Sequence, residues 1–219
     1  MKIFVTSCDK NRDIFEPFHH CIEKYWPHHP EVIYNTETVE NPYYKTICTD
    51  YPLNLWTKRT REALKQINDN KILLMADDCF IRRPVDIDRL DYACQHLGGN
   101  TASFNMEKSF DANDKETDLE GFKLRTKDSL YEVSLMCGLW DRNKLIEILE
   151  RDCDPWTIET HQDSKSYDYY INSGDDIIDF GYVTWHPMGL RRGKWRREVV
   201  PFFEKEGIKV DYSIRGFDD

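Results

Sequence analysis

Two adjacent carboxylates, Asp77 and Asp78, stand where an apolar segment ends. The residues before them, 71–76, read Lys-Ile-Leu-Leu-Met-Ala, a composition typical of a strand buried on both faces of a parallel sheet. Ligands of open α/β sheets collect at the carboxyl ends of the strands. The pair could therefore hold a divalent cation together with the phosphate groups of a ligand. The alternative is a turn, in which Asp side chains accept hydrogen bonds from local backbone amides.

A basic run near the C-terminus is the second segment with chemical potential. It places five cations in the seven residues 191–197, among them Arg191, Arg192 and Lys194. These cations could close over a diphosphate, because guanidinium groups bind phosphate oxygens in pairs. A solvated face, or a docking patch for acidic lipid head groups, is the alternative.

The elements that would position these residues alternate between strands and helices. Strands are expected at 3–5, 32–34 and 71–76, and the apolar spacing predicts helices over 14–25 and 55–67 between them. This order is typical of right-handed crossovers. We therefore predict an α/β fold with a mostly parallel central sheet flanked by helices.

The second half of the chain is predicted to continue with shorter elements. The expected elements are a helix over 87–97, a strand over 101–104, a surface loop over 107–120, a hairpin of 122–126 with 131–135, a helix over 140–149 and a strand over 177–185. Residues 167–172 are not expected to form a strand, and Asp175-Asp176 behind them favours a turn.

Length and composition limit the classes of protein. The 219 residues suit a single domain. The net charge of -10 argues against broad nucleic-acid binding. Seven scattered cysteines without a CxxC pair, and no long apolar run, predict a cytoplasmic protein, with peripheral membrane contact left open.

Four segments together resemble bacterial surface-polysaccharide glycosyltransferases of the GT-A fold, which build capsule or lipopolysaccharide from nucleotide-diphosphate sugars. They are the opening strand and turn at 3–9, the helix beginning Leu55-Trp56-Thr57-Lys58-Arg59, the acidic pair, and Gly138-Leu139-Trp140 followed by Pro155-Trp156-Thr157-Ile158-Glu159. The resemblance covers residues 3–159 and implies a GT-A-like nucleotide-diphospho-sugar transferase fold. It also implies that the single domain 1–219 has a nucleotide-binding half over about 1–100 and an acceptor-side half over about 101–219.

The resemblance also implies roles for the donor side. Thr6, Ser7 and Asp9 would contact the base and ribose, and Trp56 and Arg59 would belong to the donor-site helix.

For the chemistry, the resemblance assigns the cation to Asp78, since Ala76 replaces the first acid of the usual Asp-any-Asp motif. Asp77 would contact the sugar or support the cation site, and His186 would be a further metal ligand. The cation would be Mn or Mg. Glu159 would be the catalytic base, although a Glu in the first turns of a helix that begins at Pro155 is also favoured by the helix dipole.

The expected reaction is transfer of a hexose-like sugar from a nucleoside diphosphate to a hydroxyl of a glycan or glycolipid. Direct attack assisted by one base would invert the anomeric configuration. Two alternatives remain. A nucleotidyltransferase usually carries a glycine-rich loop after its first strand, whereas Ser7 to Arg12 contains no glycine. A non-catalytic module that binds nucleotide sugars or glycans is compatible with the missing first acid.

Overall fold

The computed structural model describes residues 1–108, 114–127, 129–161, 165–181 and 189–218. A nine-stranded sheet in the order β3-β2-β1-β4-β8-β5-β9-β7-β6 runs through the molecule. Its strands are β1 Lys2–Thr6, β2 Val32–Thr36, β3 Lys45–Cys48, β4 Lys71–Ala76, β5 Thr101–Lys108, β6 Lys115–Glu116, β7 Phe122–Leu124, β8 Gly138–Asp141 and β9 Asp168–Asn172. Only β8 and β7 run against the direction of the other strands in this sheet, so the predicted mostly parallel sheet is confirmed.

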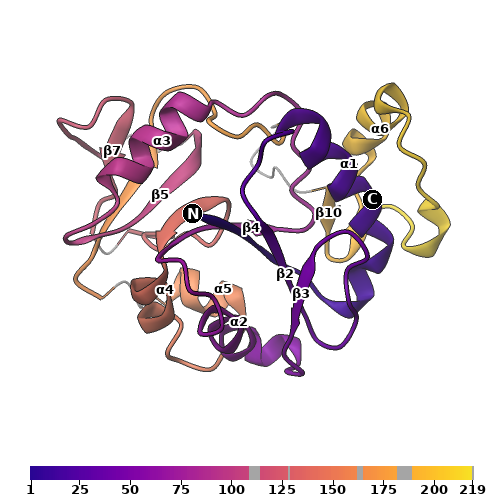
Figure 1. Ribbon diagram of the computed structural model, residues 1–219, viewed down its shortest axis with the longest axis horizontal. Helices are drawn as coiled ribbons and strands as arrows, with labels where there is room; N and C mark the ends of the chain where they lie inside the picture. The colour runs from indigo at the N-terminus through magenta and orange to yellow at the C-terminus, as the bar shows by residue number, and fades with distance from the viewer. Residues whose placement is uncertain (109–113, 128, 162–164, 182–188, 219) are drawn as a thin grey trace.

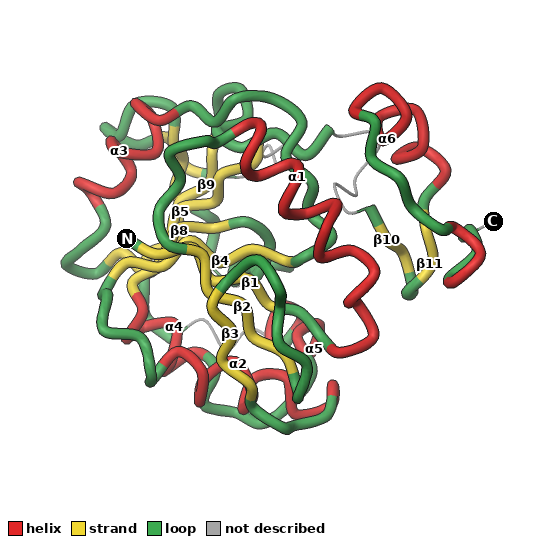
Figure 2. The backbone as a smooth tube through the Cα atoms, turned by 45° about the vertical axis from the view of Figure 1, so that its right-hand side comes forward, coloured by secondary structure: helices red, strands yellow, loops and turns green. Residues whose placement is uncertain are grey.

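Helices cover both faces of the sheet, as Figures 1 and 2 show. The α-helices are α1 Phe15–Tyr25, α2 Trp56–Leu64, α3 Ile87–His96, α4 Arg142–Ile148, α5 Pro155–Thr160 and α6 Val200–Glu206. In the view of Figure 1, α1, α3 and α6 lie above the sheet, and α2, α4 and α5 lie below it. Each layer of helices packs on the sheet through its own apolar cluster, so that both faces of the sheet contribute to the hydrophobic core.

The register of the central strands fixes where the acids lie. β1 and β4 pair in parallel, with Thr6 opposite Ala76, so both strands end at the same edge of the sheet. Asp77 follows directly and donates its backbone N–H to the carbonyl of Thr6 at 3.3 Å. The sequence-based strand and the placement of the acids at its carboxyl end are therefore confirmed.

The first half of the chain follows the predicted pattern closely. The strands predicted at 3–5, 32–34 and 71–76 and the helices predicted over 14–25 and 55–67 all form, with ends shifted by no more than a few residues. Their apolar spacing determines which side faces the core, and this local signal is sufficient where each crossover is regular.

The helix predicted to begin at Trp140 is wrong in its first residues. Gly138–Asp141 form β8, which lies between β4 and β5 and is antiparallel to both. Trp140 is fully buried there, and the helix α4 begins only at Arg142. Asp141 caps that helix by accepting hydrogen bonds from the backbone N–H groups of Asn143 and Lys144. An apolar run this short suits a buried strand as well as a helix.

The hairpin predicted for 122–126 with 131–135 is also wrong. β7 pairs with β9 and β6, and residues 131–135 form no strand. The prediction lacks β9, over Asp168–Asn172, which is parallel to β5 and in which Tyr169 and Ile171 are buried. The alternation of polar and apolar residues in β9 was overlooked because charged and tyrosine residues dominate the segment. The prediction also has loops where β3 and β6 form.

Two further segments differ from the prediction. The surface loop expected over 107–120 begins with the end of β5 and contains β6, while residues 109–113 lie outside the described part. In the segment 177–185, residues 177–181 form no strand, and the remainder lies outside the described part. Within the described residues, the structure contains no helix that is long and apolar enough to cross a bilayer.

The C-terminal segment forms a small substructure of its own beside α1. The two-stranded hairpin of β10, Leu190–Arg191, with β11, Lys194–Trp195, places Trp195 against the rings of Phe80, Phe203 and Tyr212. Figure 2 shows this hairpin beside α6, close to the C-terminus. The fully buried Trp195 joins the segment to the residues just behind the acid pair.

We expect Trp195→Ala to lower the free energy of unfolding by about 3–5 kcal/mol, because it leaves a large cavity in this aromatic cluster. Trp195→Phe should cost less, since the indole N–H has no hydrogen-bond partner among the described residues. Urea unfolding of both variants measures the difference. Equal stability of Trp195→Ala and wild type would show that the cluster does not hold this segment.

Candidate functional site

Asp77 and Asp78 are both buried at the centre of the sheet edge, with 3% and 8% of their surface exposed. Asp77 accepts a hydrogen bond from the Ser7 hydroxyl, and the side-chain amide of Asn11 lies 3.0 Å from each of its carboxylate oxygens. The donors therefore come from the turn after β1. Ser7 and Asp77, both chosen from the sequence, are brought into direct contact.

Burial controls the protonation of the pair. It is the largest cause that raises the pKa of Asp77, and the neighbouring charge of Asp78 raises it further. Burial also raises the pKa of Asp78, while hydrogen bonds from backbone N–H groups, including that of Leu190, lower it. Two adjacent carboxylates with little water around them repel each other when both are ionised.

The pair fits a hard divalent cation in charge and chemistry. Neither carboxylate has an ion pair with Lys or Arg among the described residues, and oxygen ligands are those that Mg and Mn prefer. The described residues contain no cluster of three metal-ligating side chains, so further ligands would have to be phosphate oxygens or water. His186, the other ligand predicted, lies outside the described residues. The cation site stays a prediction.

Asp9 and Thr6 are occupied by contacts within the protein. The Asp9 carboxylate accepts hydrogen bonds from the backbone N–H groups of Thr38 and Val39 at 3.0 Å and from the Thr38 hydroxyl at 2.6 Å. The Thr6 hydroxyl donates to the carbonyl of Met75 at 3.3 Å. Asp9 thus joins the loop after β1 to the loop after β2, and its predicted contact with a ribose stays a prediction.

Trp56 and Arg59, at the start of α2, are also buried. Trp56 packs in the core on the α2 face with 6% exposure. Arg59 donates to the carbonyl of Ser7 at 2.6 Å and forms an ion pair with Glu37, whose other oxygen accepts from the backbone N–H of Asp9 at 2.6 Å. Arg59 therefore fixes the backbone of the turn after β1, and direct contact of either residue with a donor stays a prediction.

The predicted basic run lies beside the acid pair. The backbone N–H of Gly189 donates to the carbonyl of Asp78 at 2.8 Å, and the β10–β11 hairpin follows at once. Arg192 and Gly193 form its turn with φ angles of 51° and 77°, the left-handed conformation of a tight hairpin. Arg191, Arg192 and Lys194 are all exposed, and only Arg191 has an ion pair, 3.3 Å from Asp218, among the residues that the structure describes.

Glu159 lies on α5, which begins at Pro155, so the helix of the alternative account forms and the role of catalytic base stays a prediction. Its Oε1 accepts a hydrogen bond from the backbone N–H of Leu135 at 2.7 Å, and burial raises the pKa of Glu159 to about 7. Since β8 is antiparallel to β4, with Gly138 opposite Leu74, the residues just before β8 lie at the edge where β4 ends. Glu159 and the acid pair therefore share one edge of the sheet.

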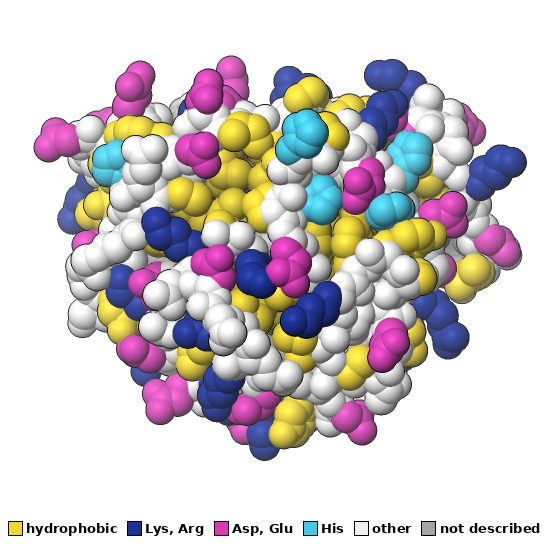
Figure 3. All heavy atoms as spheres, in the orientation of Figure 1, with side chains coloured by type: hydrophobic (Ala, Val, Ile, Leu, Met, Phe, Trp, Pro, Cys, Tyr) yellow, Lys and Arg dark blue, Asp and Glu magenta, His cyan; other side chains and the backbone are white. Residues whose placement is uncertain are grey.

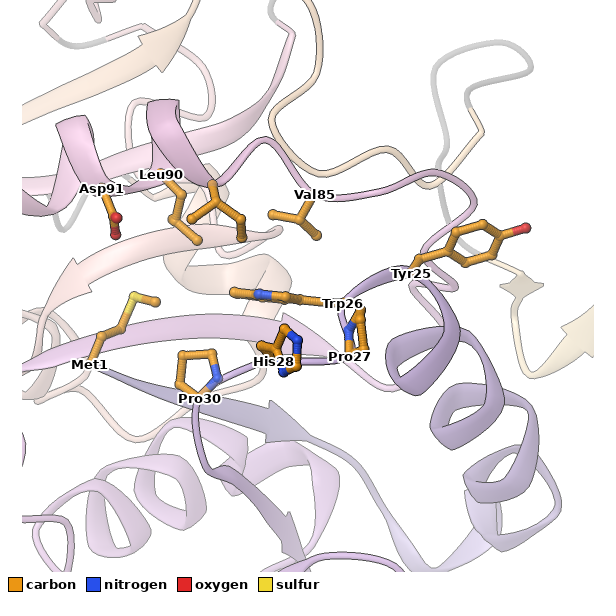
Figure 4. A pocket seen from close by; sticks show the side chains of 10 residues that line it. Met1, Tyr25, Trp26, Pro27, His28, Pro30, Val85, Leu90 and Asp91 are labelled. Atoms are coloured by element: carbon orange, nitrogen blue, oxygen red, sulfur yellow. The ribbon is translucent and has the colours of Figure 1, made fainter.

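An apolar pocket lies at the opposite edge and has no part in this constellation. It has a volume of about 460 Å³, and Figure 4 shows Trp26 between Leu90 on one side and Pro30 on the other. Hydrophobic side chains also gather on this face between α1 and α3 in Figure 3. The lining of the pocket includes one carboxylate, that of Asp91, so the acid pair is the stronger candidate for a site that binds a cation and phosphate.

Comparison with known proteins identifies the fold. A scan against protein families and a search of curated proteins found no match. Among solved structures, TarS from S. aureus matches with a TM-score of 0.52 and 13% identity over 80% of this chain and 35% of TarS. TarS 1–349 in complex with UDP matches with a TM-score of 0.50 and 12% identity over 80% of this chain and 58% of the other. The predicted α/β fold, with a mostly parallel central sheet flanked by helices, is shared with these two TarS structures.

A nucleotidyl transferase from Methanothermobacter thermautotroptrophicus is also similar, with a TM-score of 0.49 and 13% identity over 79% of this chain and 87% of the other. The fold assignment rests on the two TarS structures. The chain spans less than two thirds of the length of either TarS chain. At these sequence identities the likeness extends to the fold alone and identifies neither a donor substrate nor a reaction.

Three residues of the site were not found from the sequence. Asn11 and Glu37 follow β1 and β2, and Arg215 lies near the C-terminus, where it donates to the Asn11 side-chain oxygen at 3.0 Å. Asn11 follows β1 in a polar segment, so its position shortly after a strand was a usable signal. Arg215 is 204 residues from Asn11 in the chain and had no local signal.

The raised pKa of Glu159 predicts a pH-dependent stability that does not depend on any activity. Its ordinary value is 4.5 and its value in the fold is about 7. The native state therefore binds the proton more tightly than the unfolded state, and the resulting stabilisation is complete below pH 4.5 and lost as pH rises through 7. Ionisation at pH 8 should cost about 1–3 kcal/mol.

Glu159→Gln keeps the oxygen that accepts from Leu135 and removes the charge, so the variant should gain stability over wild type as pH rises from 5 to 8. Urea unfolding across that pH range, with Glu150→Gln at an exposed position as control, measures the effect. A constant difference between Glu159→Gln and wild type at all pH values would contradict the raised pKa.

Proposed function

We propose that the protein is a glycosyltransferase that moves a sugar from a nucleoside-diphosphate sugar to a hydroxyl of a glycan or glycolipid acceptor. The observation that carries the proposal is the buried pair of Asp77 and Asp78 at the end of the central strand, flanked by an exposed basic hairpin. A diphosphate needs both a cation site and positive side chains. The fold shared with TarS supports a nucleotide-sugar donor.

The donor's diphosphate would lie between the acid pair and the hairpin. Asp78 links the two, since its carbonyl accepts from Gly189 and the cationic turn follows three residues later. Bound at the acids, a divalent cation would neutralise the charge that builds on the leaving diphosphate. Arg192 and Lys194, exposed and without ion pairs among the described residues, are free to add to that neutralisation.

Glu159 would act as the base for the acceptor. The acceptor hydroxyl would give its proton to the Glu159 carboxylate while its oxygen bonds to the anomeric carbon and the bond to the diphosphate oxygen breaks. The nucleoside diphosphate leaves with the electron pair of that bond, and the configuration inverts. A pKa of about 7 suits this role, because the group is partly ionised at neutral pH and binds a proton readily.

A nucleotidyltransferase is the second candidate, because it uses the same fold and the same strand-end acids. The position of Glu159 favours transfer to a hydroxyl, because nucleotidyl transfer to a phosphate acceptor uses an oxygen that is already ionised and needs no base. The two reactions differ in their products. Release of nucleoside diphosphate from a nucleotide sugar supports the proposal, and release of pyrophosphate from a nucleoside triphosphate would replace it. Binding of a nucleotide sugar without either product would identify a non-catalytic module.

Donor binding is tested by thermal shift with nucleoside diphosphates and their sugars, with UDP first because TarS was solved with it. We expect one base to raise the Tm by several degrees, with a larger rise in the presence of Mn. Asp78→Asn should lose the part that depends on Mn, whereas the exposed control Asp88→Asn should keep it. A shift with Mn that survives in Asp78→Asn would remove Asp78 as cation ligand.

The role of Glu159 is tested by turnover. We expect Glu159→Gln to bind the donor as wild type does and to lower kcat by roughly 10²–10⁴-fold, the usual contribution of a general base. In wild type, kcat/KM should rise with pH through about 7, because the base must be ionised. Steady-state kinetics over pH 5.5–8.5 measures both. Full turnover by Glu159→Gln would exclude it as the base.

A further inference from the structure

The C-terminal segment returns to the turn that holds the acid pair. Backbone hydrogen bonds tie the segment to β11, with the N–H of Trp195 donating to the carbonyl of Gly216 at 3.0 Å. This arrangement sets Arg215 against the 3-10 turn of residues 9–14. The proposed function assigns no role to this segment.

Arg215 is held there by an ion pair and several hydrogen bonds. Its side chain is 8% exposed, and its guanidinium pairs with the Asp13 carboxylate, with Nε 2.7 Å from Oδ2. The same group donates to the carbonyl of Lys10 at 2.8 Å and to the side-chain oxygen of Asn11 at 3.0 Å. It also donates to the carbonyl of Gly193 at 3.3 Å, which connects it to the basic hairpin.

The hydrogen bond from Arg215 fixes the orientation of the Asn11 side-chain amide. A guanidinium has donors and no acceptor, so the amide oxygen of Asn11 must face Arg215. The NH₂ group of Asn11 then faces Asp77, 3.0 Å from each carboxylate oxygen. A flipped amide would turn its oxygen toward the carboxylate, where it would lose the hydrogen bonds and add repulsion.

We propose that Arg215 is a positioning residue of the donor site, which fixes the Asn11 amide so that it holds the Asp77 carboxylate for the cation and diphosphate. The inference rests on the proposed function for what the acids bind, and on contacts between described residues for the positioning. Arg215 touches neither acid directly, and it acts through Asn11.

The electrostatics of the pair act in the same sense. Burial is the largest influence on the pKa of both acids and raises it, and the charge of Arg215 acts in the opposite direction on each. A cation at position 215 therefore favours the ionised pair even without contact. A substitution that conserves the charge at position 215 separates this long-range electrostatic effect from the orientation of the Asn11 amide by hydrogen bonding.

Arg215→Lys is the decisive variant. Lysine keeps the charge and can pair with Asp13, but its single ammonium lacks the planar fork that reaches Asp13, the Lys10 carbonyl and Asn11 together. Arg142→Gln is the matched control, because Arg142 also donates to backbone carbonyls, those of Leu64 and Ile67, at the opposite edge of the sheet. Circular dichroism and thermal unfolding establish that both variants fold.

Two measurements follow on the full chain. The side-chain amide resonances of Asn11, assigned by ¹⁵N NMR through their loss in Asn11→Ala, report the hydrogen bonds to Asp77 in the absence of ligand. Calorimetric titration with Mn and the nucleoside diphosphate that binds wild type reports the donor site. We expect Arg215→Lys to shift the Asn11 resonances and weaken binding by about 10- to 100-fold, the range for a lost hydrogen bond to a charged group.

The control Arg142→Gln should change neither quantity. In the double variant Asn11→Ala with Arg215→Lys, binding should be no weaker than in Asn11→Ala alone, since both act through one contact. Unchanged Asn11 resonances, unchanged affinity, or additive losses in the double variant would each overturn the inference. If wild type binds no nucleotide, the proposed function fails, and the Asn11 resonances still decide whether Arg215 orients the amide.

Discussion

The burial of two adjacent carboxylates at the end of the central strand is the constraint on which the rest of the site depends. Removing a carboxylate from water is costly, and two side by side also repel each other. The groups in direct contact with the pair, among the described residues, are neutral donors, namely the Ser7 hydroxyl, the Asn11 amide and backbone N–H groups. The compensation is incomplete, which is why the pKa of each acid is raised.

The topology explains how these groups meet. Parallel pairing of β1 with β4 puts the turn after β1 directly over Asp77, and the buried Arg59 of α2 holds the backbone of that turn through the Ser7 carbonyl. The antiparallel strand β8 begins at this same edge, and Leu135, just before it, donates its backbone N–H to Glu159 of α5, so that Glu159 also lies at this edge. One edge thus collects candidate cation ligands, a basic hairpin and a candidate base from segments dispersed over the chain.

The part of this arrangement that could be predicted from the sequence is the local part. The apolar run before Asp77 carries its signal within a few residues, and its strand was predicted correctly. The proline that begins α5 is an equally local signal, and the helix formed there was the alternative account of Glu159. Trp140 and Asp141 of β8 were assigned to the helix that follows because so short an apolar run suits either element, and only the neighbours β4 and β5 decide between them. β9 was missed because its pairing with β5 is non-local.

The candidate site shows the same limit. The sequence indicated which residues stand at strand ends, but not which of them face one another. Asp9 and Arg59, both predicted to contact the donor, have their charges satisfied by Thr38 and Glu37. Arg215 could not be predicted as a site residue, because its partners Lys10 and Asn11 lie about 200 residues earlier in the chain and only the tertiary structure brings them together.

The arginines and lysines around the site fall into two groups, those that hold the turn after β1 and those that are exposed. Two arginines hold the turn after β1: Arg59 forms an ion pair with Glu37 and Arg215 forms one with Asp13, and neither forms an ion pair with the acids. The cations that remain exposed beside the site lie on the β10–β11 hairpin. A lysine or arginine placed directly on the acid pair would neutralise it permanently and compete with a divalent cation. Arg59 and Arg215 instead hold the turn after β1 without pairing with the acids. The negative charge of the acid pair is then neutralised only when a cationic ligand binds, and relief of the repulsion between the two carboxylates adds to the free energy of binding.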